Sequence, residues 1–378
     1  MDYLCASGWG FGMIPCANPL AQYRSHRDEI LEAVRCVLDG DQYVLGPKVE
    51  KLERDFSAYC GVSYGIGVNS GTDALILALR ALDVGPEDEV ITVSHTALAT
   101  VSAIMATGAT PVLVDVDPVY YTMDPESLRL AVTDKTKGVI AVHLYGQCAD
   151  MDEIMQISRL HGLFVIEDCA QAAGAIYKGK RVGSIGDAGC FSFYPTKNLG
   201  AIGDGGMVVT QNTKLAERIG RLRQYGWDKN RITQEHGFNS RLDEIQAAIL
   251  GVKFPALDGE NARRNEIARC YGEALLNLPI TLPKVRSLTT HVHHLYVITC
   301  QNRDMLKKHL LNRQVVAGIH YPIPVHRHGG YDSHTRCATR GLPVTEFLVD
   351  HILTLPLFPE LTDAQVDKVI EAVRSYYV

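Results

Sequence analysis

The sequence lacks long hydrophobic runs and a recognisable leader. No stretch of its 378 residues approaches the roughly 20 consecutive apolar residues that a helix needs to span a bilayer. The opening MDYLCASGWGFGMIPC has neither a basic region nor a continuous apolar core, and both are features of a signal peptide. We therefore expect a cytoplasmic protein without a membrane span.

The sequence also lacks a surplus of basic residues. It has 37 Lys and Arg against 43 Asp and Glu, which gives a formal net charge of -6. Proteins that bind nucleic acid or anionic membranes through their overall charge carry a basic patch or stripe. Such partners are therefore not expected, and an anionic ligand must be met by a local cluster of donors.

Motifs for disulfides and metals are missing as well. The ten cysteines are scattered and no two form a CxxC pair, which predicts free, buried thiols. Histidines gather in HVHH at 291–294 and in HRH at 326–328. Neither group has a partnering cysteine or carboxylate motif, so we expect packing or substrate contacts there and no metal.

Strand and helix patterns alternate through the first two thirds of the chain. Short apolar strands such as YGIGV (64–68) and FVIED (164–168) alternate with segments such as GTDALILALRAL (71–82), whose apolar residues recur at helical spacing. This alternation predicts an α/β fold with a mainly parallel sheet covered by helices on both faces. In such sheets, ligands bind at the carboxyl ends of the strands.

A change of pattern after about residue 240 predicts a second domain. A long helical stretch leads there to a strand in VHHLYVITC, a helix in DMLKKHLLNR, a further strand near VVAGIHYPIP and a closing amphipathic helix. We predict a large domain over residues 1–255 and a smaller C-terminal α/β domain over residues 256–378.

Three motifs that follow predicted strands bear on function. Gly71 and Thr72 in VNSGTDAL lie where a helix begins, and free N–H groups there favour a phosphate, although Ser, Thr and Asp are also ordinary helix caps. Asp168 ends an apolar strand, where a carboxylate needs a cationic or proton-donating partner unless it caps the next turn. Lys197 follows CFSFY; desolvation favours its neutral, nucleophilic amine, although a lone lysine can equally extend from a loop into solvent.

Together the three motifs match the needs of pyridoxal 5'-phosphate. The phosphate of this cofactor needs an anion site, its pyridinium nitrogen needs a carboxylate and its aldehyde needs an amine. Lys197 would then be held as an internal Schiff base instead of a solvated charge.

Eight ordered segments resemble one family of enzymes. They are NSGTDAL, DVDPVYYTMDP, HLYGQCADMD, VIEDCAQAAGA, GDAGCFSFYPTKNLGAIGDGGMVVT, NSRLDEIQAAIL, HHLYVI and GIHYPIPVH. By these segments the chain, from about Pro15 to its C-terminus, is identified as a member of the DegT-type sugar aminotransferases. The resemblance implies the aspartate-aminotransferase-like fold of pyridoxal phosphate enzymes (fold type I) and a homodimer with shared active sites.

The resemblance also implies roles for individual residues. Lys197 would be the Schiff-base lysine, Asp168 would contact the pyridine nitrogen and Gln171 would contact the 3-hydroxyl of the cofactor. The residues implied to hold the phosphate are Gly71, Thr72, Ser192 and Asn239 of the partner subunit.

One position departs from the pattern of the family. Many relatives carry Trp or Phe, stacked on the cofactor ring, at the position that aligns with Ala97. We interpret His95 as the replacement and therefore as a cofactor contact. His143 in HLYGQ is expected either near the cofactor or in the core.

The reaction implied by the resemblance is amination of a nucleotide-linked keto sugar with L-glutamate as donor, with Lys197 as general acid and base. HLYGQ followed by CADMD resembles enzymes acting at C-3, which favours a dTDP-3-keto-6-deoxyhexose. The expected substrate contacts are Tyr194, His320 and Tyr321 for the sugar, and Tyr225, Lys229, Arg231 and Arg241 for the diphosphate.

Several alternatives stay open. The acceptor could be a C-4 keto sugar, a UDP-linked sugar or a cyclitol ketone, because each needs the same cofactor site. A non-catalytic regulatory protein that binds the cofactor is a further alternative, against which the intact Lys197, Asp168 and Gln171 argue. A sugar dehydratase is disfavoured, because those relatives replace the lysine by histidine.

Overall fold

The computed structural model describes residues 12–378. The interpretation of the opening segment rests largely on residues 1–11, which lie outside the described residues. Within 12–378, no helix is both long and apolar enough to cross a membrane. The cysteines of this range are free, as predicted, and Cys60, Cys148, Cys169, Cys190 and Cys300 are buried. The prediction of buried thiols is wrong for Cys36 and Cys337, which are exposed.

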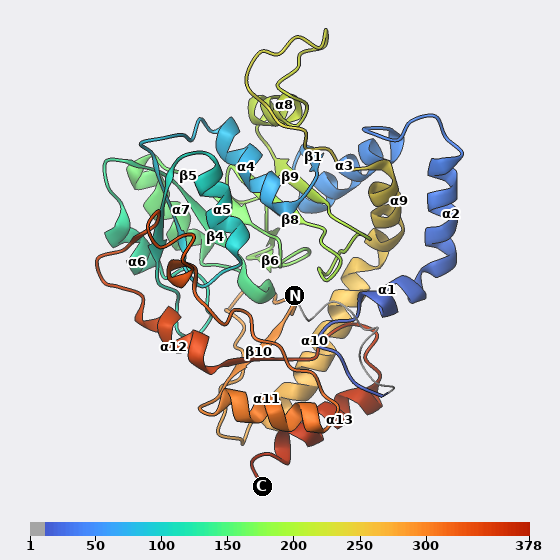
Figure 1. The fold of residues 1–378 in the computed structure, drawn as a ribbon, viewed down its shortest axis with the longest axis vertical. Helices are drawn as coiled ribbons and strands as arrows, with labels where there is room; N and C mark the ends of the chain where they lie inside the picture. The colour runs from blue at the N-terminus through green and yellow to red at the C-terminus, as the bar shows by residue number, and fades with distance from the viewer. Residues whose placement is uncertain (1–11) are drawn as a thin grey trace.

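An eight-stranded sheet forms the centre of the upper part of the molecule (Figure 1). The strand order is β1-β9-β8-β5-β4-β2-β3-β11. Only the pairs β1–β9 and β8–β9 are antiparallel, so the predicted mainly parallel sheet is confirmed. Its strands are β1 (Tyr64–Val68), β2 (Glu89–Val93), β3 (Thr110–Val114), β4 (Thr136–Val142), β5 (Phe164–Asp168), β8 (Ala188–Ser192), β9 (Gly206–Thr210) and β11 (Arg336–Cys337).

Apolar residues on both sides of the strands explain why this sheet is buried. Along β4 and β5, Ile140 and Ile166 face one core, while Val139 and Val165 face the other. Successive side chains of a strand point to opposite faces, so a strand covered on both sides must be apolar throughout. The short, continuously apolar runs in the sequence are therefore strands that are buried on both faces.

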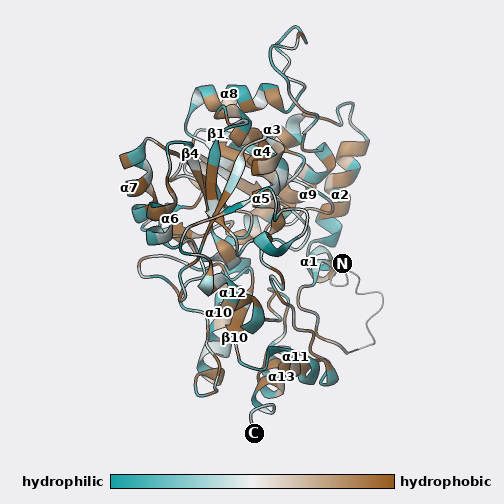
Figure 2. Ribbon diagram, turned by 60° about the vertical axis from the view of Figure 1, so that its left-hand side comes forward, coloured by the Kyte–Doolittle hydropathy of each residue, from teal (hydrophilic) through white to brown (hydrophobic). Residues whose placement is uncertain are grey.

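Helices cover the two faces of the sheet. One face packs against α4 (Gly71–Ala81), α5 (Leu98–Ala106) and α8 (Thr213–Leu222). Helix α8 alternates between brown and teal along its length in Figure 2, and its buried residues Leu215, Ala216, Ile219 and Leu222 belong to this core. The other face packs against α3 (Pro47–Cys60), α6 (Pro125–Ala131), α7 (Met151–His161) and α9 (Glu244–Lys253).

The chain enters the fold through two helices and leaves the sheet through a long one. The entering helices α1 (Pro19–Ser25) and α2 (Arg27–Leu38) lie beside α9 (Figure 1). After the short helix η3 (Phe254–Ala256), the long helix α10 (Leu257–Leu275) runs from the upper part into the lower part.

The lower part has its own hydrophobic core, built from α10, the pair β10–β12 and the last helices. The expected strand near VVAGIHYPIP is wrong: Val315 and Gly318 form only isolated bridges, to Ile14 and Thr354. The remaining elements are β10 (Tyr296–Thr299), α11 (Arg303–Asn312), η4 (Val325–Arg327), α12 (Pro343–His351), β12 (Ile352–Leu355) and α13 (Asp363–Arg374), with η2 (Leu144–Gly146) and the hairpin β6 (Ile176–Tyr177) and β7 (Lys180–Arg181) in the upper part.

A buried carboxylate fastens α9 to the start of α3. Glu244 is 1% exposed, and its oxygens accept hydrogen bonds from the backbone N–H groups of Gly46 at 2.8 Å, Lys48 at 2.9 Å and Val49 at 2.9 Å. These N–H groups lie at a helix N-terminus and have no intrahelical acceptor. A carboxylate there also interacts favourably with the helix dipole.

We predict that Glu244→Ala lowers the free energy of unfolding by about 2–3 kcal/mol, because three backbone donors lose a charged acceptor. Chemical denaturation followed by circular dichroism measures this change. The control is Asp243→Ala, an exposed neighbour whose side chain makes no capping hydrogen bond and whose loss should cost less than about 0.5 kcal/mol. Equal stability of the two variants would contradict the prediction.

Candidate active site

The predicted site residues gather at one edge of the sheet. Strands β1, β8, β5, β4 and β2 run in the same direction, so their carboxyl ends lie together. Gly71 follows β1, Ser192 ends β8, Asp168 ends β5 and His95 follows β2. The fold thus brings together residues that are more than 120 positions apart.

The N-terminus of α4 and the end of β8 form a tight corner. A Cβ atom added to Gly71 would lie only 2.6 Å from the Cβ of Ser192 and 3.2 Å from its Oγ, so only glycine permits this approach. Ser70 caps the helix by accepting a hydrogen bond from the backbone N–H of Asp73 at 3.1 Å. The first N–H groups of the helix, which include Thr72, and the Ser192 hydroxyl therefore form a corner suited to a phosphate.

Asp168 is a buried carboxylate at the same edge of the sheet. It is 6% exposed; one carboxylate oxygen accepts a hydrogen bond from the Thr100 hydroxyl at 2.8 Å and the other from the backbone N–H of Ala170 at 3.1 Å. Among residues 12–378, no Lys, Arg or His lies within ion-pair distance of it. A protonated ring nitrogen would supply the missing charge.

Lys197 lies in the loop after β8 and opens into a cavity. Burial lowers the pKa of its amine to about 8, an effect that the negative charge of Asp168 opposes. The cavity has a volume of about 260 Å³. Its walls come from segments of both parts of the chain: 16–19 with Gln22, 194–197, Arg264, 294–295, 320–321 and 357–360.

Gln171 connects the turn after Asp168 to the wall of this cavity. Its Oε1 accepts a hydrogen bond from the backbone N–H of Tyr145 at 2.6 Å, and its Nε2 donates to the Tyr321 hydroxyl at 2.9 Å. Burial raises the pKa of Tyr321 to about 12, so this hydroxyl stays protonated. Tyr194, His320 and Tyr321, all predicted sugar contacts, line the cavity beside Lys197.

His95 is buried at the edge where the cofactor is expected, and Ala97 beside it begins α5. The Tyr145 hydroxyl donates to the backbone carbonyl of His320, so His95 donates to that hydroxyl from Nε2, at 2.7 Å. Its Nδ1 has no hydrogen-bond partner, and burial lowers the pKa of the ring to about 4. His95 is thus a neutral ring with a free acceptor.

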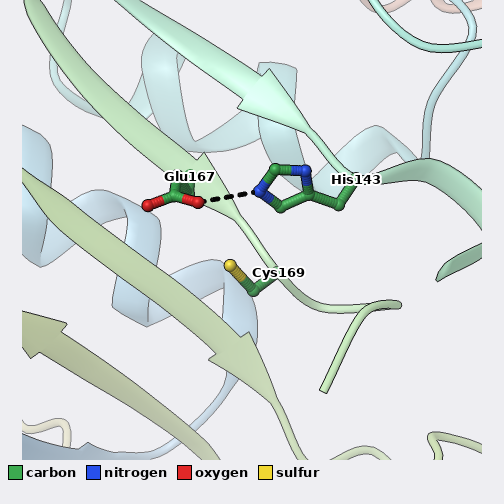
Figure 3. Close-up of side chains that lie close together, drawn as sticks. All are labelled: His143, Glu167 and Cys169. Atoms are coloured by element: carbon green, nitrogen blue, oxygen red, sulfur yellow. Dashed lines mark hydrogen bonds and ion pairs between the residues drawn. The ribbon is translucent and has the colours of Figure 1, made fainter. Parts of the chain in front are cut away.

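His143 lies in the core beneath this edge (Figure 3). Its Nδ1 accepts a hydrogen bond from the backbone N–H of Ala149 at 3.0 Å, so its Nε2 carries the proton that it donates to Glu167 at 3.0 Å. Cys169 lies close by without a bond to either residue in the figure. The contacts of His143 are therefore those of a core residue, which was one of the two expectations.

The predicted diphosphate contacts lie elsewhere in the chain. Tyr225, Lys229 and Asn239 are exposed, and the segment 225–239 forms the loop that projects beyond α8 at the top of Figure 1. Neither they nor Arg231 and Arg241 line the cavity of Lys197. The segment returns to the N-terminus of α4 at Ser240, whose hydroxyl donates to Asp73 at 2.7 Å.

His294 is a cavity residue that sequence reasoning did not single out. Asn198 donates from Nδ2 to Asn261 at 2.8 Å and to the carbonyl of Val292 at 3.0 Å, which leaves its Oδ1 as acceptor for His294 Nδ1 at 3.1 Å. His294 therefore carries its proton on Nδ1, and its Nε2 is an acceptor. The motif HHLYVI contained this signal, but spacing alone did not separate His294 from His291 and His293, which stack at 3.9 Å.

Arg264 and Glu360 were also missed. Both line the cavity, one from α10 and one from the segment after β12. The sequence around each residue is typical of an exposed helix or turn. Only packing between distant segments brings Arg264 and Glu360 into the cavity of Lys197. No local sequence signal could have identified them.

Comparisons with known proteins agree with this geometry. The model of the DegT/DnrJ/EryC1/StrS aminotransferase family matches residues 24–374. A dTDP-3-amino-3,6-dideoxy-alpha-D-galactopyranose transaminase of Aneurinibacillus thermoaerophilus is 45% identical over 96% of this chain and 99% of its own. A UDP-N-acetyl-3-dehydro-alpha-D-glucosamine 3-aminotransferase of Acidithiobacillus ferrooxidans is also 45% identical, over 95% of this chain and 97% of its own.

Solved structures show the same fold. Streptomyces venezuelae DesV, solved in complex with a ketimine intermediate, is 44% identical, with a TM-score of 0.94 over 97% of this chain and 98% of its own. NtdA of Bacillus subtilis, solved with the cofactor PMP, is 31% identical, with a TM-score of 0.90 over 97% of this chain and 86% of its own. The chain belongs to the DegT/DnrJ/EryC1/StrS aminotransferase family and is an enzyme that transfers amino groups with pyridoxal phosphate as its cofactor.

Proposed function

We propose that the enzyme transfers the amino group of L-glutamate to C-3 of a dTDP-3-keto-6-deoxyhexose. The observation that carries the proposal is the Lys197 amine, whose pKa is lowered to about 8 and which opens into a cavity at the sheet edge that holds Asp168. The names of the relatives support a sugar acceptor aminated at C-3.

The chain offers a partner for each polar group of the cofactor. Pyridoxal phosphate supplies the carbonyl that accepts the amino group and a ring that withdraws electrons. We assign the pyridine nitrogen to Asp168 and the covalent link to Lys197. Gln171 and His95 face the ring region, and the phosphate corner consists of Gly71, Thr72 and Ser192.

Lys197 also moves protons in this scheme. An amine with a pKa of about 8 is partly neutral near neutral pH, and efficient acid–base groups have pKa values near the working pH. Because Lys197 shares its cavity with Tyr194 and His320, a sugar held by these residues presents its reacting carbon to the amine. In the scheme, Lys197 would remove the proton from the α-carbon of L-glutamate in the first half of the reaction, and in the second half it would deliver a proton to C-3 of the sugar, which as a ketone carbon carries none.

In this proposal, a second subunit binds the diphosphate of the substrate. Tyr225, Lys229, Arg231 and Arg241 supply cationic and hydroxyl donors suited to a diphosphate, but they do not line the cavity in their own chain. We infer a homodimer in which this projecting loop, together with Asn239, completes the site of the partner. An isologous interface makes the exchange reciprocal.

A UDP-linked 3-keto sugar is the second candidate acceptor. The Acidithiobacillus ferrooxidans relative carries UDP in its name and is as similar to this chain as the dTDP-sugar transaminase. The two acceptors differ in the nucleoside and in the C-2 substituent, which is next to the reacting C-3.

The experiment that tests the function is a two-step transamination. The purified enzyme, loaded with pyridoxal phosphate, is mixed first with L-glutamate, and the change in the visible absorbance of the cofactor is recorded. A dTDP-3-keto-6-deoxyhexose and a UDP-3-keto sugar are then added separately, and the amino sugar is identified by mass spectrometry. Restoration of the first spectrum by neither sugar would refute the assigned acceptor class.

We predict that Lys197 in the cofactor-free protein reacts with an amine-acetylating reagent with a midpoint near pH 8, because only the neutral amine is nucleophilic. Peptide mass spectrometry at several pH values measures this midpoint. Lys180, which is exposed, is the internal control. Asp168→Asn should move the Lys197 midpoint lower still, since the carboxylate raises that pKa. Equal midpoints for Lys197 and Lys180 would be evidence against a buried amine.

We predict that two defective subunits complement each other. Lys197→Ala has no activity alone, and Asn239→Ala has little at limiting cofactor. In a mixed dimer, the one site with both residues intact draws Lys197 from one subunit and Asn239 from the other. Random co-assembly should therefore restore about one quarter of wild-type activity, because half of the dimers are mixed and each has one working site of two. Co-expression with two affinity tags provides the sample, and no recovery would show that Asn239 serves its own chain.

A further inference from the structure

Arg264 is a buried cation without a matching anion. It projects from α10 and is 5% exposed. Its Nη1 donates to the backbone carbonyls of Leu357 at 3.1 Å and His293 at 3.4 Å, while its Nε has no hydrogen-bond partner. Within residues 12–378, no carboxylate lies within 4 Å of the guanidinium.

The energetics of burial call for an anion here. Removing a guanidinium from water costs free energy that neutral carbonyl acceptors only partly return. Burial lowers the pKa of Arg264 to about 10, and only the more distant charges of Glu260 and Glu360 oppose this shift. Because the group remains charged at neutral pH, an anionic ligand would stabilise it.

The cavity places this cation beside Lys197. Arg264, Lys197 and the acceptor nitrogen of His294 line the same space of about 260 Å³. Pockets that bury drug-sized ligands measure about 300–1,000 Å³. An amino acid or one sugar ring is small enough for this space.

Glu360 is the acidic residue that lines the cavity. Its Oε2 is buried and has no hydrogen-bond partner, and burial raises the pKa of its carboxyl, while Arg264 and His26 oppose the rise. An entering anion repels the ionised carboxylate of Glu360. Arg264 and Glu360 should therefore affect the binding of an anion in opposite directions.

We propose that Arg264 binds a carboxylate of the amino donor while the donor's amino group faces Lys197. This inference rests on the proposed function only in that the donor is an amino acid. The guanidinium offers a planar set of donors that matches a carboxylate. A diphosphate of the nucleotide sugar is the other source of negative charge, and the test separates the two.

Titration calorimetry with two unreactive probes tests the proposal on the cofactor-loaded enzyme. Glutarate represents the donor without its amino group, and dTDP represents the nucleotide. Arg264→Gln should weaken the glutarate Kd by about 10–100-fold, the effect of losing a charged hydrogen-bonded partner, and leave the dTDP Kd unchanged. Glu360→Gln should tighten glutarate binding at pH 8.

The neighbouring Arg263 provides a matched control. It lies on the same helix, is half-buried, pairs with Glu266 and Asp363 and does not line the cavity, so Arg263→Gln should leave both Kd values unchanged. In steady-state assays, Arg264→Gln should raise the KM for L-glutamate and leave the KM for the keto sugar in place.

The outcomes separate the inference from the proposed function. Unchanged glutarate binding in Arg264→Gln, or an equal loss of glutarate and dTDP binding, overturns the assignment of Arg264. If Arg264→Gln does not fold, Glu360→Gln carries the test, and glutarate binding that is not tightened overturns the assignment. If the wild-type enzyme aminates no keto sugar, the proposed function is wrong. The glutarate titration still tests the role of Arg264 in that case, because it does not depend on the acceptor.

Discussion

The exclusion of charge from a sheet buried on both faces governs where this enzyme can do chemistry. Along β4 and β5 the side chains alternate between two apolar cores, so an ionised group within the sheet must be surrounded by hydrogen-bond donors. Most polar groups are accordingly confined to the points where strands end. Because five strands end at the same edge, Gly71, Asp168 and Ser192 converge there without any one segment containing them.

The same constraint explains how much of the site the sequence revealed. Asp168 and Lys197 could be predicted because each follows an apolar strand, where a charge needs a reason, and Gly71 because it begins a helix after a strand. The close approach of Gly71 to Ser192 gives a physical basis for that glycine which spacing could not provide. The parallel sheet and its helices followed from the alternation of short apolar runs with helical periodicity.

The rest of the site depends on packing between distant segments. Arg264, His294 and Glu360 meet in the cavity only because α10, the segment before β10 and the segment after β12 fold back on the loop of Lys197. The apolar residues of Val315–Gly318 predicted a strand, yet this segment forms only two isolated bridges. Apolar composition alone therefore does not predict whether a segment pairs as a strand. The tautomer of His294 depends on an amide whose orientation is fixed by two further partners, a relation that no local pattern encodes.

Glu167 and Asp168 are adjacent carboxylates that point to opposite sides of β5. Glu167 is fully buried; it accepts hydrogen bonds from the backbone N–H groups of Gly183 at 2.8 Å, Ile185 at 2.7 Å and Gly186 at 2.8 Å, besides that from His143. A slip of β5 by one position would exchange the two carboxylates and leave an unpaired charge in the core. Glu167 thus fixes the register of β5: it makes the wrong alignment of this strand far costlier than the right one and so decides which of two neighbouring acids faces the edge where the other site residues gather.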